Sequence, residues 1–178
     1  MRNGPIIILL GSNIAPRANL LAAVRLLAAH EHVTVRAASR VYQSAPVDAQ
    51  GRIDPAQDPF LNAALCVETD LAPVELKFGV LRAVEAQLGR VRTEDKFAPR
   101  PIDLDIVLYG DLVLDDAENG ITLPDPDLLR RAHVALPAAD VAPDATHPVT
   151  GQRLAEIAAS LSGTDLRLAD DLDLACAI

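Results

Sequence analysis

A short stretch near the middle of the chain, residues 102–108, constrains the fold more than any other. Apolar residues occupy every second position in it, and Asp103 and Asp105 lie between them. A period of two predicts a β-strand with both carboxylates on one face and an apolar opposite face, formed by Ile102, Leu104, Ile106 and Leu108. Residues two apart on a strand are separated by roughly 6.5–7 Å, so the two carboxylates could share one or two Mg²⁺ ions. The same pattern also suits the solvated face of a half-buried sheet.

The loop before this strand favours the metal-binding interpretation. Four basic side chains lie close together in it, at Arg90, Arg92, Lys96 and Arg100. A site that handles a polyphosphate needs both kinds of group, because carboxylates hold the metal ions and a guanidinium binds phosphate oxygens in a bidentate fork. A solvated strand face needs no basic loop beside it.

The size and charge of the chain exclude several classes of protein. Its 178 residues, half of them apolar, are enough for one globular domain, which we place at residues 1–160. Residues 161–178 are expected to form a solvated acidic tail. The net charge of −9 argues against nucleic acid or an anionic membrane surface as a partner. Apolar runs are far shorter than the ~20 residues of a membrane span, and no signal peptide is recognisable, so we expect a cytoplasmic protein, which we take to be a monomer.

The order of the predicted elements is β-α-β-β-α-β. Strands are expected at residues 6–10, 33–42, 61–67 and 102–109, and helices at about 16–28 and 73–88. This order predicts an α+β fold, a ferredoxin-like mixed sheet with helices on its faces and a C-terminal extension. The apolar stripe of the second helix would comprise Val74, Phe78, Leu81, Val84 and Leu88.

Residues 44–59 form a long connection rich in Pro, Asp and Gly, which we interpret as a binding loop or lid. Phe60 and Asn62 follow it on one face of the next strand. A ring and an amide in this arrangement could stack on and hydrogen-bond a flat heterocycle, although a surface Phe and a strand-edge Asn would give the same pattern. Two other motifs have simpler interpretations. Gly11-Ser12-Asn13 suits a turn or helix cap, and Arg82 with Glu85 suits an exposed ion pair.

Together these motifs resemble the 6-hydroxymethyl-7,8-dihydropterin pyrophosphokinases of folate biosynthesis over residues 5–158. The resemblance rests on Leu10-Gly11-Ser12-Asn13, on Val41-Tyr42 followed by Ser44-Ala45-Pro46-Val47, on Phe60-Leu61-Asn62-Ala63-Ala64, on Glu85 ahead of Gly89-Arg90-Val91-Arg92, and on KFAPRPIDLDIV from Lys96 to Val107. It implies that diphosphate passes from ATP, the co-substrate, to the hydroxymethyl group of 6-hydroxymethyl-7,8-dihydropterin, with AMP as the other product. It also implies two Mg²⁺ ions and no covalent intermediate.

The resemblance further implies roles for individual residues. The metal ligands would be Asp103 and Asp105, and the catalytic residues would be these two together with Arg90 and Arg100. The nucleotide-binding residues would be Arg82, Glu85, Arg92, Lys96, Ile106, Thr122 and Arg131. The pterin-binding residues would be Ser44, Ala45, Pro46, Val47, Phe60, Asn62 and His133.

The chain departs from the family pattern at three places. Asp125-Pro126 stands where the family usually has His-Pro, and His133 stands where it usually has Phe. Thr93-Glu94-Asp95 makes the loop before the acidic strand less basic than in many relatives.

Two other functions account for parts of the pattern. A minimal nucleotidyltransferase also pairs Gly-Ser with Asp-x-Asp, but in that family the motifs are close in sequence, whereas Ser12 and Asp103 are about ninety residues apart. A non-catalytic ferredoxin-like binding or regulatory domain would suit the order of elements. It would leave the acidic pair and the basic loop unexplained.

Overall fold

An antiparallel β-sheet forms the centre of the molecule. The structure is a computed structural model that describes residues 4–47, 50, 52–92, 98–161, 166–169 and 171–178. Hydrogen-bonded neighbours follow the order β5-β1-β4-β3-β8, and β2 also pairs with β4. The strands are β1 (Ile6–Ser12), β2 (Val33–Ala38), β3 (Tyr42–Ser44), β4 (Phe60–Thr69), β5 (Asp103–Tyr109) and β8 (Arg167–Leu168). A separate hairpin consists of β6 (Leu114–Asp116) and β7 (Ile121–Leu123).

The prediction of a mixed sheet is wrong, since every pairing between these strands is antiparallel. The first helix does connect two strands that run in the same direction, β1 and β2. These strands are not neighbours, however, because β4 lies between them and pairs with both. The α+β class and the presence of helices on the sheet are confirmed.

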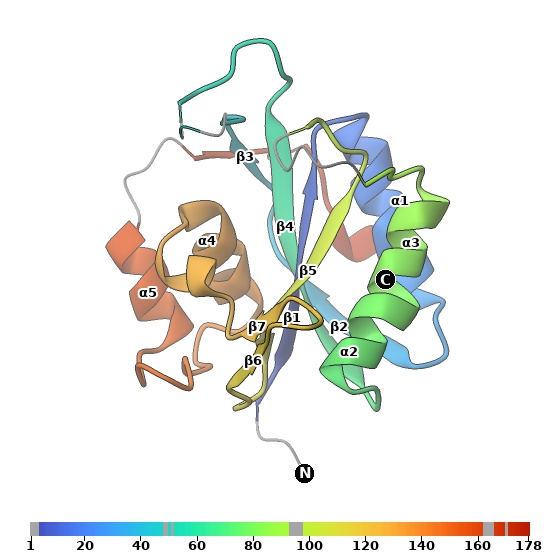
Figure 1. Ribbon diagram of the computed structural model, residues 1–178. Coiled ribbons are helices and arrows are strands. Elements are labelled where there is room, and N and C mark those ends of the chain that lie inside the picture. Colours follow the sequence, from blue (N-terminus) through green and yellow to red (C-terminus); the bar gives the residue numbers. More distant parts are fainter. Residues whose placement is uncertain (1–3, 48–49, 51, 93–97, 162–165, 170) are drawn as a thin grey trace.

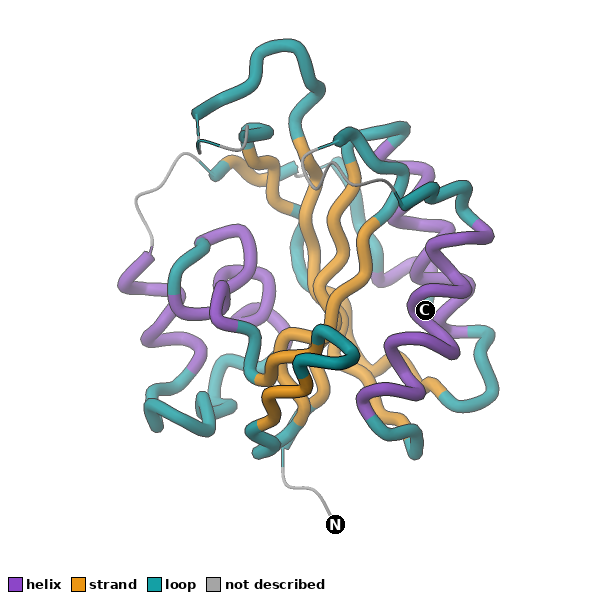
Figure 2. Tube along the Cα trace, viewed as in Figure 1, coloured by secondary structure: helices purple, strands orange, loops and turns teal. Residues whose placement is uncertain are grey.

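Helices cover both faces of the sheet (Figures 1 and 2). One face carries α1 (Pro16–Ala28) and a continuous helix made of α2 (Pro73–Glu75), a π-helical segment η1 (Leu76–Leu81) and α3 (Arg82–Gln87). The other face carries α4 (Ala132–Val141) and α5 (Leu154–Leu161), preceded by a short 3₁₀ helix, η2 (Pro126–Leu129). None of the helices in the described ranges is long and apolar enough to cross a membrane.

A hydrophobic core lies between the sheet and each of the two layers of helices. Alternate side chains of β1 point into one core or the other. Ile8 and Leu10 face the core beneath α1 and α3, whereas Ile7 faces the core beneath α4 and α5. On β5 the predicted alternation holds through Ile106, but Leu108 packs into the second core instead of the first. A register shift opposite Ile7 and Ile8 accounts for this error, because a β-bulge adds one residue and reverses the faces that follow.

The π-helical segment changes which side chains of the second helix are buried. Leu76 and Leu81 are both fully buried, five residues apart, as the wider π-turn allows. Phe78, which we placed in the apolar stripe, is 42% exposed. The error arose because a stripe drawn with 3.6 residues per turn does not allow for the extra residue of a π-turn.

The described C-terminal residues, 166–169 and 171–178, do not form the solvated tail that we expected. Arg167 and Leu168 form β8, which pairs with β3 and adds a strand to the sheet. Leu174 and Ala177, in and next to the 3₁₀ turn η3 (Ala175–Ala177), are buried in the core beneath α1. The sequence is rich in Asp here, and that composition concealed the few apolar residues that anchor the segment.

Candidate active site

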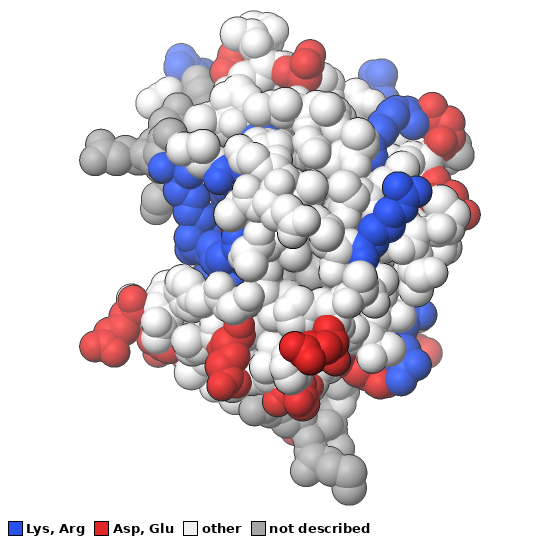
Figure 3. Space-filling model, turned by 90° about the vertical axis from the view of Figure 1, so that its right-hand side faces the viewer, with Lys and Arg blue, Asp and Glu red and all other residues white. Residues whose placement is uncertain are grey.

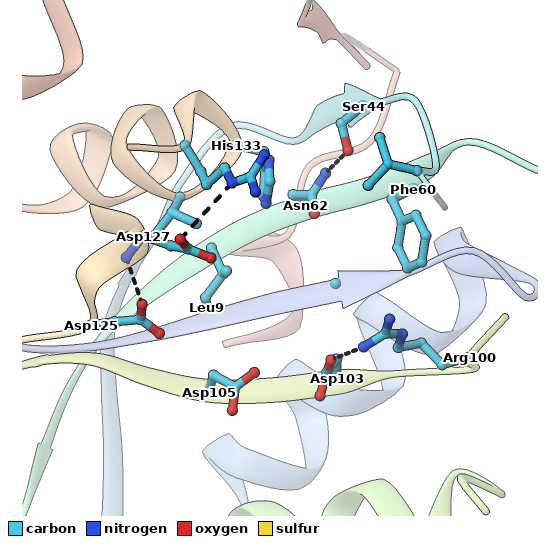
Figure 4. A pocket seen from close by; sticks show the side chains of 14 residues that line it. Leu9, Ser44, Phe60, Asn62, Arg100, Asp103, Asp105, Asp125, Asp127 and His133 are labelled. Carbon is cyan, nitrogen blue, oxygen red and sulfur yellow. Dashed lines mark hydrogen bonds and ion pairs between the residues drawn. The ribbon is translucent and has the colours of Figure 1, made fainter. Parts of the chain in front are cut away.

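A cavity of about 320 Å³ lies between β5, the start of β4 and the N-terminal end of α4 (Figure 4). Its lining brings together residues that are far apart in sequence. They are Leu9, Gly11, Ser44, Val47, Phe60, Asn62, Arg100, Asp103, Asp105, Asp125, Asp127, Arg131, His133 and Val134. Most of the residues predicted to bind the pterin or metal ions are among them.

The acidic pair reaches this cavity because of the alternation on β5. Leu104 and Ile106 are buried in the core, so Asp103 and Asp105 point to the opposite side of the sheet. In the pairing with β1, Asp103 lies opposite Gly11 and Asp105 opposite Leu9. The floor of the cavity beside the carboxylates is therefore formed by β1, whose side chains were not among the predicted site residues.

Asp103 is held between two arginines. The Arg90 guanidinium forms an ion pair with one carboxylate oxygen, and Arg100 Nη1 lies 2.5 Å from the other. Arg90 also donates to the Ile102 carbonyl at 2.8 Å, so its position is fixed by the backbone that precedes β5. Burial would raise the pKa of the Asp103 carboxyl, but the charges and hydrogen bonds of the two arginines together hold it below its usual value.

Asp105 has a different environment from its neighbour. Within the described part of the chain, no hydrogen bond or ion pair involves its carboxylate. Burial and, secondarily, the negative charge of Asp103 raise the pKa of Asp105 to about 6. An unpaired carboxylate with a raised pKa beside a second carboxylate is suited to a divalent cation, which would supply the missing positive charge.

A second cavity of about 250 Å³ adjoins the first. Its lining comprises Lys77, Asp105, Ile106, Gly120, Ile121, Thr122, Asp125 and Pro126. Ile106 and Thr122 were predicted to lie on the nucleotide side, and both line this second cavity. Asp105 and Asp125 line both cavities, so the two spaces meet at these carboxylates.

Asp125 has a structural role as well as a place in the site. Its side chain accepts a hydrogen bond from the Asp127 backbone N–H at 2.8 Å and thereby caps η2. Burial raises the pKa of Asp125, and the Asp127 hydrogen bond opposes that shift. The departure from the family pattern therefore places a third carboxylate near the acidic pair.

An aromatic and polar recess forms the other end of the first cavity. The Asn62 amide donates to the Ser44 hydroxyl at 2.9 Å, and the Arg100 guanidinium carbon lies 5.4 Å from the centre of the Phe60 ring. Figure 4 shows Asn62 between Phe60 and His133. Burial lowers the pKa of His133, which favours a neutral imidazole at pH 7. Val47 also lines the cavity, whereas Ala45 and Pro46 do not.

Glu85 and Arg82 do not form the exposed pair that we expected. Glu85 is only 2% exposed, and its carboxylate accepts hydrogen bonds from the Leu104 N–H at 2.9 Å and from Arg90 and Arg92. Arg82 instead lies over the Phe78 ring at 5.3 Å. Glu85 thus connects α3 to β5 and to the arginines, and neither it nor Arg82 lines the two cavities described above. Lys96 lies outside the described residues.

Ser12 and Asn13 do more than form a turn. The Ser12 hydroxyl donates to the Pro101 carbonyl at 2.5 Å, and Asn13 Oδ1 accepts from the Arg100 N–H at 2.8 Å. The Asn13 amide also donates to the Asp58 carbonyl at 3.3 Å. This motif therefore connects the loops on either side of the cavity, and its tertiary contacts could not be seen from its spacing.

Basic side chains gather locally despite the acidic composition. Figure 3, which views the face made by α1 and α3, shows the largest group of them at the left edge, with other basic side chains scattered over the right side. Paired carboxylates, facing arginines and an aromatic recess are features typical of one class of protein, an enzyme that moves a phosphoryl-type group. Such transfer requires mainly positioning and neutralisation of charge.

Comparison with known proteins identifies the family. The model of the 7,8-dihydro-6-hydroxymethylpterin-pyrophosphokinase (HPPK) family matches residues 7–143. A Methylorubrum extorquens protein named 2-amino-4-hydroxy-6-hydroxymethyldihydropteridine pyrophosphokinase is 39% identical over 153 residues, which cover 85% of this chain and 90% of that protein. A Synechocystis protein of the same name is 34% identical over 149 residues, covering 83% and 71%. This chain belongs to the HPPK family.

A solved structure agrees with this assignment at the level of the fold. The crystal structure of wild-type Plasmodium falciparum HPPK-DHPS superposes with a TM-score of 0.62 at 13% identity, over 89% of this chain and 45% of that one. This chain thus spans less than half the length of that protein, and at this identity the likeness concerns the fold alone.

Proposed function

We propose that this protein transfers the terminal diphosphate of ATP to the hydroxymethyl group of 6-hydroxymethyl-7,8-dihydropterin, releasing AMP, as a step in folate synthesis. The observation that carries the proposal is the meeting of two cavities at Asp105, one member of the acidic pair. One cavity suits a flat heterocycle and the other suits a nucleotide. The bond that breaks and the bond that forms would lie where the two spaces join, beside Asp105, with Asp103 on the side of the first cavity.

Asp103 and Asp105 would hold two Mg²⁺ ions between the chain and the triphosphate. Bound Mg²⁺ would neutralise the charge on the phosphate oxygens and polarise the phosphorus that is attacked. The donors fit this ion, because Mg²⁺ is usually bound through one or two carboxylates, with water and phosphate filling the other positions. Among the described residues, no three or more acidic, His or Cys side chains are arranged so that they alone could hold a metal ion, so substrate oxygens would be needed.

Arg90 and Arg100 would change partners during the reaction. In the structure both neutralise Asp103, and both are largely buried, with side-chain exposures of 11% and 22%. A phosphate group bound at the carboxylates would offer these guanidinium groups more acceptors of the same charge. They would then stabilise the charge that develops on the diphosphate as it moves, assisted by Arg92 and Lys96 from the same loop.

The pterin would lie between Phe60 and His133, with its amide edge against Asn62. The Asn62 amide and Ser44 hydroxyl already form a hydrogen-bonded pair, which orients both groups. A neutral imidazole can stack on a flat ring without adding a charge to the recess, which favours His133 as a substitute for an aromatic hydrocarbon.

A product assay tests the proposal against its rivals. With ATP, Mg²⁺ and the reduced pterin, we expect AMP and the pterin diphosphate. Release of pyrophosphate would instead indicate a nucleotidyltransferase, and absence of any product would favour a binding domain. Asp103→Asn and Asp105→Asn should nearly abolish AMP formation, whereas Asp144→Asn, at an 88% exposed carboxylate remote from the cavities, should not.

The proposal also covers the topology of the sheet, the oligomeric state and the cellular location. The strand order β5-β1-β4-β2, with helices between β1 and β2 and between β4 and β5, supports a ferredoxin-like topology for residues 1–160. We further propose a cytoplasmic protein, and a net charge of −9 supports a monomer, since like-charged copies repel one another. Sedimentation would test the monomer by returning a mass near 18.9 kDa.

A further inference from the structure

The C-terminal strap, residues 166–169 and 171–178, lies beyond the part of the chain that the family model matches, which ends at residue 143. Figure 1 shows it running from β3 toward α1. Its two ends are anchored in different ways, by backbone hydrogen bonds at β8 and by apolar side chains near η3. The strap therefore connects the edge of the sheet to the main hydrophobic core.

Contacts at the first end are made by the backbone. Leu168 pairs with Tyr42 and Arg167 with Gln43, and the Ala169 N–H donates to the Val41 carbonyl at 2.9 Å. At the second end Leu174 is 1% exposed and packs with the α1 side chains of the main core. Burial of an apolar side chain so completely requires the strap to remain docked in the folded protein.

The strand that the strap supports is β3, which is only three residues long. Its last residue, Ser44, lines the first cavity and accepts the hydrogen bond from Asn62. On one side β3 pairs with the start of β4, where Ser44 lies opposite Phe60. On the other side it pairs with β8. Without β8, this short strand would be an edge strand with exposed backbone groups, the kind of element that opens locally at low free-energy cost.

We propose that the C-terminal strap positions the pterin half of the active site, by pairing with β3 and so fixing Ser44 against Asn62. The proposal rests on the proposed function, because it takes the recess at Ser44, Phe60 and Asn62 as the pterin site. The effect is selective, since no residue of β3 lines the second cavity, where the nucleotide would bind. The strap acts through β3 and touches neither substrate.

Two substitutions loosen the strap at opposite ends. Ala169→Pro removes the N–H that donates to Val41, since proline has no backbone donor. Leu174→Ala removes most of the apolar anchor in the core. Ile178→Ala serves as the control, because Ile178 belongs to the same strap but is 49% exposed.

The test compares binding of the two substrates by calorimetry with amide hydrogen exchange. In Ala169→Pro and Leu174→Ala we expect the Kd for the pterin to rise roughly three- to tenfold, with the Kd for a non-hydrolysable ATP analogue and Mg²⁺ within about twofold of the wild type. Amides of residues 42–44 should exchange faster while those of β1 do not. Ile178→Ala should match the wild type in every measurement.

Three results would overturn the strap's role or its premise. Faster exchange in β3 with unchanged pterin affinity would show that the strap supports the sheet without positioning the site. An equal loss of pterin and nucleotide affinity would show a general loss of folding. Failure of the wild-type protein to bind the pterin would overturn the proposed function, on which the strap's role depends. This outcome is seen in the wild type alone, so it can be told apart from a failure that appears only in the strap variants.

Discussion

Asp105 is partly buried next to a second carboxylate, and both features raise its pKa to about 6 from an ordinary value of 3.8. Because one pKa unit corresponds to about 1.4 kcal/mol, ionised Asp105 lowers the free energy of unfolding at pH 7 by on the order of 3 kcal/mol. We expect Asp105→Asn to raise that free energy by a similar amount while turnover is lost. Urea unfolding at pH 7 measures it.

The pH dependence gives this prediction a second check. A carboxyl with a raised pKa in the folded state binds more protons there than in the unfolded state, so its cost grows as pH rises. The cost should be complete above about pH 6 and absent below about pH 4, where Asp105 is protonated in both states. The stability difference between variant and wild type should therefore shrink as pH falls. Equal stabilities of the variant and the wild type at pH 7 would contradict a raised pKa at this partly buried, unpaired carboxylate.

Arg100 and Arg90 are expected to affect the rate more than the affinity. Both guanidinium groups would interact most strongly with charge that develops as the diphosphate moves. For Arg100→Ala and Arg90→Ala we predict a fall in kcat of roughly 10²–10³-fold, with ATP affinity changed by much less. Single-turnover kinetics separates the two effects. Arg153→Ala, at an exposed site beside α5, is the control, and a loss confined to KM would reduce both residues to a binding role.

Asp125 places an extra carboxylate where two cavities meet, and its negative charge should oppose binding of the triphosphate. Asn at this position can still accept the hydrogen bond from Asp127 and cap η2, so it removes the charge and retains the local structure. We predict that Asp125→Asn tightens ATP binding by about fivefold, equivalent to roughly 1 kcal/mol, and leaves pterin affinity unchanged. Calorimetry at two salt concentrations tests this, since screening should shrink the gain. Weaker binding in the variant would indicate that Asp125 helps to hold a cation.

At the scale of elements, Asp140 connects α4 to the β2–β3 segment. Its carboxylate accepts from the Tyr42 hydroxyl at 2.9 Å and from Arg40 at 2.6 Å. Burial raises the pKa of Tyr42 to about 12, and the hydrogen bond to Asp140 makes the next largest contribution to this shift. Asp140→Ala leaves the hydroxyl of the buried Tyr42 without its acceptor, which should cost about 1–3 kcal/mol of stability.

Arg40 provides the matched comparison for that prediction. Its side chain is 63% exposed, so the ion pair with Asp140 is screened by solvent. Arg40→Ala should therefore cost less than about 1 kcal/mol in the same urea titration. If both substitutions cost the same, the ion pair and not the buried hydroxyl would dominate the contact between α4 and β3.

Elements with a strong local period were predictable, and those shaped by neighbours were not. The helix at α1 and the strands at β1, β4 and β5 follow from apolar spacing. The π-turn at Leu76–Leu81 and the bulge opposite Ile7 and Ile8 each insert one residue into a regular pattern. Both insertions depend on how the segment packs against the sheet, so they cannot be predicted from the spacing of apolar residues in one sequence.

At the scale of the whole molecule, the acidic pair and the Phe60–Asn62 face were recognisable because each depends on alternation within one strand. The residues that complete the cavity, such as Leu9, Asp127 and Val134, come from elements brought together only by the strand order. The β8 strand was missed for a related reason. Two residues in an acidic segment carry almost no local signal, and only the exposed edge of β3 gives them a partner.

Arg100 forms a salt bridge to Asp103 and covers the Phe60 ring at the same time. In the free protein, the Arg100 guanidinium therefore neutralises the carboxylate that would hold Mg²⁺ and the nucleotide. It also covers the ring on which the pterin would stack. Each binding event is therefore an exchange of contacts and not the filling of empty space. Whichever ligand draws Arg100 away removes a competitor of the second, so the two binding sites should be thermodynamically linked, each ligand raising the apparent affinity of the other by the same factor.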